Sequence, residues 1–271
     1  MEGVTSMFSS KLEFKGAVIG MLLGDASIPR ARTPGTTHHL QITHCMEQEG
    51  YLLQKKKILE YLTDVRFYTD QVNNKDHRCC RLVTKTHPFY NSMRDHMYYE
   101  GRATVNEHVM KCLTPLGLAL WYLDDGSCSI RGNYNVPIIG TCAYNLAEHE
   151  MMSRMLQKRF GFQWRVNRTT STYKGIRKNI YILRLRLKDR ENFFNLIREF
   201  VPECLLYKID ESRDIEPKQR VSIACAECGQ ISDKWPQQIT GKFMCGTCRK
   251  QLTRNNNRIL DIHPEDVLCS A

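Results

Sequence analysis

Four cysteines near the C-terminal end of the chain have the spacing of a zinc site. Cys225 and Cys228 form one CxxC pair, and Cys245 and Cys248 form a second pair after a spacer of 16 residues. Each pair presents two thiolates, and Zn²⁺ accepts a tetrahedral set of four without redox chemistry. A redox pair or a chance arrangement is the alternative. Because all four ligands would come from the protein, we expect a closed, structural site and not a catalytic one.

The sequence also repeats itself at a spacing of about one hundred residues. The pattern aromatic-aromatic-Asn-x-apolar-Arg-acid occurs at residues 89–95 and again at residues 193–199. Upstream of each copy, an apolar run leads into acidic residues, at 17–25 and at 118–125. Two landmarks at similar offsets indicate an internal duplication.

The duplication aligns Asp25 with Asp125, and Gly24 with Asp124. If the two apolar runs are helices that pack in parallel, the two aligned aspartates meet at one end of the pair. Carboxylates there face each other and the negative ends of two helix dipoles, so their ionised forms need a cation such as Mg²⁺. Paired acids with bound metal are typical of phosphodiester hydrolysis. The alternative is that they are ordinary helix-end carboxylates; Asp124 is the weaker candidate.

The same order of elements is expected in both copies. The first helix begins at Ser10, which has the form of a capping box with Glu13, and its counterpart begins at Thr114 followed by Pro115. Gly161 is expected to end a later helix. Helical patterns cover residues 48–62 and 146–160, and strand patterns cover residues 39–45, 65–72, 78–86, 136–144, 163–170 and 179–188. The order αββαββα therefore appears twice.

These elements predict an α+β protein of two pseudo-symmetric repeats and a small zinc-ribbon module. The expected boundaries are 10–108, 109–216 and 217–271, the last one following a polar segment that contains Pro217. Small residues, namely Gly20, Gly24 and Ala119, would let the two central helices approach closely.

An excess of basic residues favours a polyanionic partner. The chain has 39 Lys and Arg against 29 Asp and Glu, a net charge of +10. Residues 163–188 contain no acid, and alternation over 181–188 is expected to place Arg184, Arg186 and Lys188 on one strand face and Leu183, Leu185 and Leu187 on the other. A solvated charged face is the alternative. The predicted DNA contacts are Arg165, Arg168, Lys174, Arg177, Lys178, Arg184, Arg186 and Lys188, then Arg66, Lys75, Arg78, Arg81 and Lys85, and in the zinc module Arg249 and Lys250.

Other features of the sequence bear on the cellular compartment of the protein. The longest apolar run, residues 17–23, is too short to span a membrane and does not precede a cleavage site. With 12 cysteines, the chain is expected in a reducing compartment, a bacterial or viral-host cytoplasm or an organelle, and not outside the cell. The nine histidines give no ligand set and are expected on the surface or facing DNA, and the other eight cysteines in the core or at neutral positions.

At residues 18–26 and 118–126 the chain resembles the LAGLIDADG homing endonucleases, in their monomeric form with two motifs on one polypeptide. The resemblance covers about residues 10–210. It implies a saddle of two antiparallel sheets over a long double-stranded DNA target. It also implies that Asp25 and Asp125 bind Mg²⁺ and that both strands are cut across the minor groove, leaving 3′ overhangs.

The resemblance further implies one basic residue near the metals in each half. Lys208 matches the second of these positions, and Arg102 stands where lysine is usual in the first half. Because arginine changes the geometry and cannot act as a base, slower cleavage of one strand is expected. Ala26 replaces a typical glycine, a milder departure. The same scaffold can also serve a non-cleaving protein, such as an intron RNA maturase or a transcription factor. The zinc ribbon is expected either to contact DNA or only to dock on its neighbour.

Overall fold

The computed structural model describes residues 8, 10–30, 33, 35–71, 78–131, 134–141, 143–173, 176–209, 221–234 and 243–252. The chain divides into two compact units, Met1–Arg213 and Asp214–Ala271. The second unit begins near residue 217, where the zinc module is expected to start.

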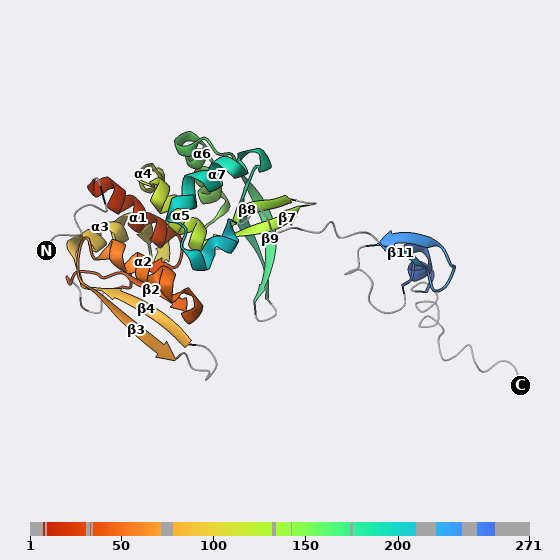
Figure 1. The fold of residues 1–271 in the computed structure, drawn as a ribbon, viewed down its shortest axis with the longest axis horizontal. Helices are drawn as coiled ribbons and strands as arrows, with labels where there is room; N and C mark the ends of the chain where they lie inside the picture. The colour runs from red at the N-terminus through yellow and green to blue at the C-terminus, as the bar shows by residue number, and fades with distance from the viewer. Residues whose placement is uncertain are drawn as a thin grey trace, which may run out of the picture. The chain divides into compact units, whose positions relative to one another are not determined.

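The first unit contains the order αββαββα twice, as the sequence predicts (Figure 1). The first copy consists of α1 (Lys11–Leu23), β1 (Ala26–Ser27), β2 (Gln41–Cys45), α2 (Glu49–Leu59), β3 (Val65–Gln71), β4 (Arg78–Thr84) and α3 (Pro88–Met97). The second copy consists of α5 (Pro115–Asp125), β7 (Gly126–Arg131), β8 (Tyr134–Ile139), α6 (Leu146–Phe160), β9 (Trp164–Tyr173), β10 (Ile176–Leu185) and α7 (Arg190–Ile197). The connection between the copies adds β5 (Tyr98–Tyr99), β6 (Arg102–Ala103) and α4 (Glu107–Lys111), which the sequence analysis did not predict.

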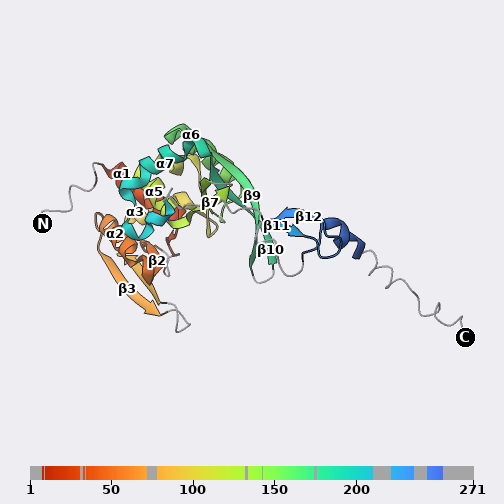
Figure 2. The same ribbon diagram turned by 45° about the vertical axis from the view of Figure 1, so that its right-hand side comes forward.

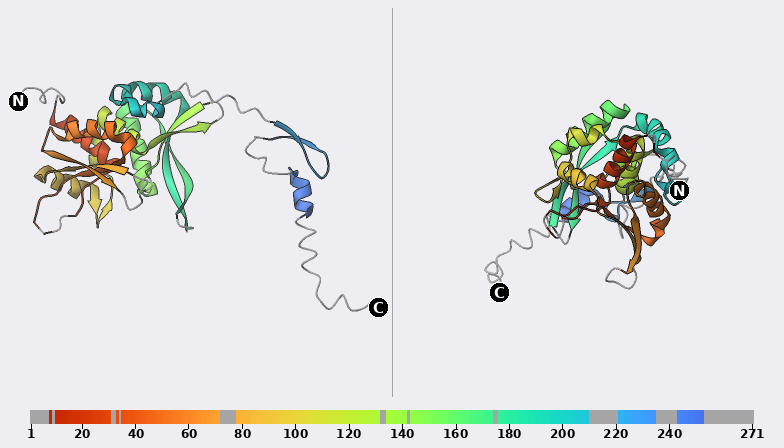
Figure 3. Two further views of the ribbon diagram at one scale, coloured as in Figure 1. Left: turned by 60° about the horizontal axis from the view of Figure 1, so that its bottom comes forward. Right: turned by 90° about the vertical axis from the view of Figure 1, so that its left-hand side faces the viewer.

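Each copy forms a four-stranded antiparallel sheet with the same topology, β1-β2-β4-β3 and β7-β8-β10-β9. Ala26 pairs with Ile42 in the first sheet, and Gly126 pairs with Ile139 in the second. This register makes Ile42 and Ile139 equivalent, and α2 and α6 begin at the same offset of 97 residues (139 − 42 and 146 − 49). In Figure 3, left, the long hairpin of β9 and β10 in the second sheet extends below the helices. The α+β fold of two repeats is therefore confirmed.

The predicted helix caps are present. The Ser10 side chain accepts a hydrogen bond from the Glu13 N–H, and the Thr114 hydroxyl accepts one from the Gly117 N–H, satisfying donors that a helix start leaves free. Gly161 ends α6 with a φ of 78°, in the left-handed region that glycine adopts without strain. The local signals of the sequence thus fix where these helices begin and end.

Several strand ends differ from the prediction, and β1 and β7 lie outside the predicted strand patterns. β8 ends at Ile139, before the predicted end. β10 ends at Leu185, because the chain after it turns into a 3₁₀-helix over Leu187–Asp189. Leu183 and Leu185 are buried as expected, but Leu187 is 41% exposed and Lys188 lies outside the strand. The predicted single row of three cations on one strand is therefore wrong beyond Arg184.

The central helices α1 and α5 pack side by side with almost no space between their backbones. A Cβ atom on Gly20 would lie 1.9 Å from the Gly117 carbonyl oxygen, and one on Gly117 would lie 2.1 Å from the Gly16 carbonyl oxygen. Gly117, and not the predicted Ala119, therefore supplies the close approach. Gly24, at the end of α1, lies beside Asp124 at the end of α5, so the helices run parallel and their C-terminal ends coincide.

The second unit contains a hairpin of β11 (Val221–Ala224) and β12 (Ile231–Lys234), followed by a helical segment over residues 246–252. Figure 2 labels both strands of this hairpin. In the part of the chain that the structure describes, no helix has the length and apolarity that a membrane crossing would require.

Candidate catalytic site at the ends of the paired helices

Three carboxylates meet where α1 and α5 end. Helix α1 stops at Leu23 with Gly24 as its cap, so Asp25 is the first residue beyond the cap, whereas Asp125 is the last residue of α5. The Asp25 N–H donates a hydrogen bond of 3.1 Å to Oδ2 of Asp124. The Asp25 side chain is 43% exposed, and the Asp124 side chain is fully buried. A Cβ atom at Gly24 would lie 2.5 Å from Asp124, so only glycine allows this contact.

The electrostatics of this cluster disfavour its ionised form. Burial, the charge of Asp25 and the charge of Asp124 together raise the pKa of Asp125 to about 7. Burial and the charge of Asp124 also raise the pKa of Asp25, while Lys55 and Lys208 oppose both shifts. Asp25 and Asp125 thus form an oxygen-rich site with excess negative charge. A divalent cation fits this donor set because it would neutralise the carboxylates.

Lys208 lies at the end of α5, as its predicted role requires. Its side chain is buried, and Nζ donates to the carbonyl oxygens of Leu123 and Asp124 at 2.6 and 3.2 Å. These are carbonyls that a helix C-terminus leaves without partners. Burial lowers the pKa of Lys208, and the three nearby aspartates oppose that shift.

Arg102, the other predicted basic residue, has a different partner. Its guanidinium forms an ion pair with Glu148, which belongs to the capping box at the start of α6. The Arg102 side chain is half exposed. The structure therefore places Lys208 against the motif acids and places Arg102 against the N-terminus of α6.

Two basic side chains of the site, Lys55 and His44, were not among the site residues predicted from the sequence. Lys55 of α2 is fully buried, and its Nζ lies 2.5 Å from Oδ1 of Asp124 and 3.0 Å from Nε2 of His44. His44 of β2 is 6% exposed, so the prediction of surface or DNA-facing histidines is wrong for this residue. Burial and the Lys55 charge lower the pKa of His44 to about 4, so its ring is neutral near pH 7.

The sequence itself contains a signal that Lys55 is buried. The buried residues of α2 are Tyr51, Leu52, Lys55, Ile58 and Leu59, which recur every three to four residues. Lys55 therefore occupies a core-facing position of an amphipathic helix, where a lysine requires a buried partner.

Asp25, His44 and Asp124 also form a group whose ligand atoms lie within 4.8 Å of one another. Nδ1 of His44 is 3.6 Å from Oδ2 of Asp25. This arrangement includes Asp124 and omits Asp125, in contrast to the pair that the sequence predicts. Lys55 competes for the same atoms, because it contacts both His44 and Asp124.

The predicted DNA contacts are distributed over both sheets. Arg66 and Arg81 lie on the face of the first sheet opposite Ile42, Cys80 and Leu82, which are buried. In the second sheet Arg165 pairs with Arg184, on the face opposite Trp164 and Leu185. Most of the other predicted residues are exposed, namely Arg78, Lys85, Arg168, Arg177, Lys178, Lys188, Arg249 and Lys250. Arg186 is half-buried, and its guanidinium donates a hydrogen bond to the side-chain oxygen of Gln163. Lys75 and Lys174 lie outside the described residues.

The basic residues of the second sheet do not share one face. Lys178 and Arg184 lie on one face of β10. Arg177 lies on the other face, which it shares with the buried Leu183 and Leu185. Arg177 is nevertheless exposed, because the β9–β10 hairpin extends past the helices (Figure 2). Cations therefore project from both faces of this hairpin end.

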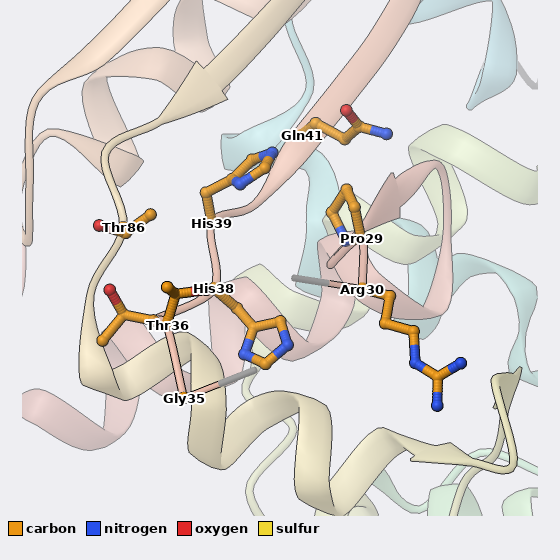
Figure 4. A pocket seen from close by; sticks show the side chains of 9 residues that line it. Pro29, Arg30, Gly35, Thr36, His38, His39, Gln41 and Thr86 are labelled. Carbon is orange, nitrogen blue, oxygen red and sulfur yellow. The ribbon is translucent and has the colours of Figure 1, made fainter. Parts of the chain in front are cut away.

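A polar pocket of about 810 Å³ lies next to the first sheet. Figure 4 shows the rings of His38 and His39 and the guanidinium of Arg30 around it. Burial and the neighbouring His38 lower the pKa of His39, which favours its neutral ring. The lining residues include no acid, so none of them repels an anion.

The four predicted zinc ligands lie together in the second unit. The sulfur atoms of Cys225, Cys228, Cys245 and Cys248 are all within 4.8 Å of one another, and those of Cys228 and Cys245 are 3.8 Å apart. The Cys245 N–H donates to the Cys225 sulfur at 3.2 Å, and such backbone donors lower the pKa of Cys225 to about 6. Four converging sulfurs fit a tetrahedral metal ion.

Comparisons with known proteins agree with the fold of the first unit. The model of the LAGLIDADG DNA endonuclease family matches residues 15–190. DNA endonuclease I-ChuI of Chlamydomonas applanata is 24% identical over 211 residues, which cover 73% of this chain and 94% of that protein. Protein RecA of Mycobacterium gastri is 32% identical over 118 residues, 42% of this chain, and the match spans only 26% of RecA.

Among solved structures, the homing endonuclease I-WcaI bound to its DNA recognition sequence is similar to this chain with a TM-score of 0.60. The identity is 17%, and the match covers 77% of this chain and 90% of that one. This likeness shows that the two proteins share a fold.

Proposed function

Because the chain belongs to the LAGLIDADG DNA endonuclease family, we propose that it is a site-specific, Mg²⁺-dependent endonuclease that cuts both strands of double-stranded DNA. The observation that carries this proposal is the convergence of Asp25 and Asp125 at the coincident ends of α1 and α5. One motif acid comes from each repeat, which suits a site that faces two antiparallel DNA strands.

Asp25 and Asp125 would hold the metal ions. When bound, Mg²⁺ supplies an activated water and stabilises the leaving oxygen in phosphodiester hydrolysis. The two carboxylates neutralise the ions and fix their place at the helix ends. The raised pKa of Asp125, about 7, means that this acid ionises fully only when a cation or a higher pH favours its charge.

Lys208 would stabilise negative charge that develops on the phosphate. An ammonium has three N–H donors, and two of those on Lys208 bind the carbonyls of Leu123 and Asp124. The third is available for a phosphate oxygen beside the motif acids. In the first half the sequence predicts the same role for Arg102, whose guanidinium instead forms an ion pair with Glu148.

The basic faces of the two sheets would bind the DNA. Arg66 and Arg81 from the first repeat, and Arg165, Lys178 and Arg184 from the second, lie on the sheet faces that the helices leave open. Because both repeats are on one chain, a monomer suffices for a long target site. Phosphate contacts of this kind make binding weaker as salt concentration rises.

The four cysteines Cys225, Cys228, Cys245 and Cys248 would bind one structural Zn²⁺. The exposed Arg249 and Lys250 follow its last ligand, where they would add a second contact to DNA. Thiolate ligands require a reducing compartment, which fits an intracellular protein.

Cleavage of a randomised duplex library in Mg²⁺ tests the function. We expect the cut ends to share one long sequence and to have 3′ overhangs. If no cut site emerges while the protein binds intron RNA tightly, or binds one duplex without cutting it, the chain is a maturase or a transcription factor on the same scaffold and the proposal fails.

A further inference from the structure

The carboxylate of Asp124 is already occupied by donors from the chain. Its Oδ2 accepts the Asp25 N–H at 3.1 Å, and its Oδ1 accepts the Tyr51 hydroxyl at 2.9 Å and the Lys55 ammonium at 2.5 Å. The side chain is fully buried. A carboxylate offers about four acceptor positions, so these three donors leave about one, and the burial of the side chain restricts access to it.

Lys55 compensates the buried charge of Asp124. Its side chain is itself fully buried, and it lies 4.3 Å from the centre of the Tyr51 ring. A buried ammonium and a buried carboxylate are each strongly unfavourable alone and tolerable as a hydrogen-bonded pair. The pair therefore anchors α2 to the end of α5.

Lys55 also orients His44. The two nitrogen atoms are 3.0 Å apart, and an ammonium can only donate, so Nε2 of His44 must accept. The proton of the neutral ring is then on Nδ1, which faces Oδ2 of Asp25 at 3.6 Å. Asp25 is thus approached by a donor from His44 on its side chain and held by Asp124 at its backbone.

We propose that Asp124, Lys55 and His44 are positioning residues for Asp25, and that Asp124 is not a metal ligand. Asp124 holds the backbone of Asp25, which has left helix α1 and has no helical hydrogen bond of its own to fix it. Lys55 keeps Asp124 in place, and His44 directs the Asp25 carboxylate.

The second repeat lacks this arrangement. The offset of 97 residues makes Thr141 equivalent to His44 and Met152 equivalent to Lys55, and both are buried. Asp125 is instead held as the last residue of α5, and its carbonyl accepts the Gly140 N–H at 3.0 Å. Loss of the positioning residues should therefore affect the chemistry of Asp25 and spare that of Asp125.

Rescue by a second substitution tests this inference, which rests on the proposed roles of Asp25 and Asp125. Lys55→Met leaves Asp124 as an uncompensated buried charge, and adding Asp124→Asn removes that charge while keeping an acceptor for the Asp25 N–H. On a duplex recovered from the library, we expect Lys55→Met to slow the strand that depends on Asp25 by about tenfold or more. The double variant should recover about threefold or more of that loss without reaching the wild-type rate, because His44 still lacks the ammonium that orients it. Asp25→Asn identifies that strand.

Mn²⁺ binding to the free protein, followed by electron paramagnetic resonance, gives a readout without nuclease activity. The double variant should bind as many Mn²⁺ ions as wild type, whereas Asp25→Asn should bind fewer. Lys56→Met, one residue further along the same helix and paired with Glu60, is the matched control and should change neither readout.

A double variant that loses Mn²⁺ as Asp25→Asn does, or that cuts no faster than Lys55→Met alone, would make Asp124 a ligand and overturn the inference. If Lys55→Met does not fold, the double variant, in which no buried charge is left unpaired, decides alone. A wild type that cuts no duplex would contradict the proposed function, and Mn²⁺ binding would still decide the role of Asp124.

Discussion

The three carboxylates at the helix ends differ in their surroundings, and their roles differ accordingly. Asp25 is partly exposed, Asp124 is buried against Lys55, and Asp125 is the helix-end acid whose pKa is raised to about 7. The repeat in the sequence identified Asp25 and Asp125, because their alignment needs only the spacing of the motifs. Lys55 and His44 escaped prediction because their partners come from other elements, which only the fold brings together.

The raised pKa of Asp125 predicts a pH-dependent contribution to stability. The ordinary pKa is 3.8, and the folded value is about 7, so between these values unfolding releases a proton from this group. Its stabilising contribution is therefore complete below about pH 4, falls as the pH rises towards about 7, and is lost above that. Without added Mg²⁺, the free energy of unfolding of Asp125→Asn should fall less than that of wild type between about pH 5 and pH 8.

Urea unfolding at several pH values measures this difference. Equal pH slopes for the two proteins would show that Asp125 titrates normally in the folded state. Added Mg²⁺ should stabilise wild type more at the higher pH, because the metal binds the ionised carboxylate.

At the scale of elements, the close pair of α1 and α5 positions the site. Capping residues and the apolar motifs were enough to predict both helices, and their parallel packing, which the sequence analysis took only as a condition, is what the structure shows. The choice of Gly117 over Ala119 as the contact residue was not predictable, because it depends on the relative rotation of the two helices. The end of β10 at Leu185 was also missed, since the alternation of Arg and Leu continues into the 3₁₀ turn.

The contact between the helix backbones predicts a large effect of one methyl group. In Gly20→Ala the new Cβ would meet the Gly117 carbonyl at 1.9 Å, and neither backbone can move without separating the helices. We expect a loss of about 3 kcal/mol or more in the free energy of unfolding. Thermal unfolding followed by circular dichroism would detect the corresponding fall in Tm.

Gly50→Ala in α2 is the matched control, because a Cβ there has no neighbour within 4 Å. Helix propensity predicts no loss, and a gain of up to about 1 kcal/mol. Similar stability of the two variants would contradict the packing described here.

At the scale of the whole molecule, the net charge and the cysteine spacing predicted more of the chain's organisation than the hydrophobic pattern did. The chain has a net charge of +10, and exposed basic residues lie on both sheets and in the described part of the second unit. The two repeats and the separate cysteine module were predictable from duplication and spacing. The connection between the repeats, with β5, β6 and α4, was not, because its short elements have no counterpart in the second copy.

The second unit is expected to depend on its metal. Its described residues, 221–234 and 243–252, form a small hairpin and a short helical segment, and Ile231 is 70% exposed, so little apolar surface stabilises this part of the unit. Cys225→Ser should lower the zinc content from one ion per chain and increase hydrogen exchange over residues 221–234, without affecting exchange in α1 or α5. Cys204→Ser, at an exposed cysteine of the first unit, is the control and should retain the zinc. Unchanged metal content in Cys225→Ser would rule out the four-thiolate site.

The most direct test of the account is strand-resolved cleavage of one target duplex by wild type, Asp25→Asn and Asp125→Asn in Mg²⁺, with binding measured in Ca²⁺. Each variant removes one negative oxygen ligand and keeps the size of the side chain. We predict that each loses double-strand cleavage by at least about a hundredfold while its affinity for the duplex changes by less than about threefold. A variant that cuts both strands at the wild-type rate would contradict the assignment of its aspartate to the catalytic site.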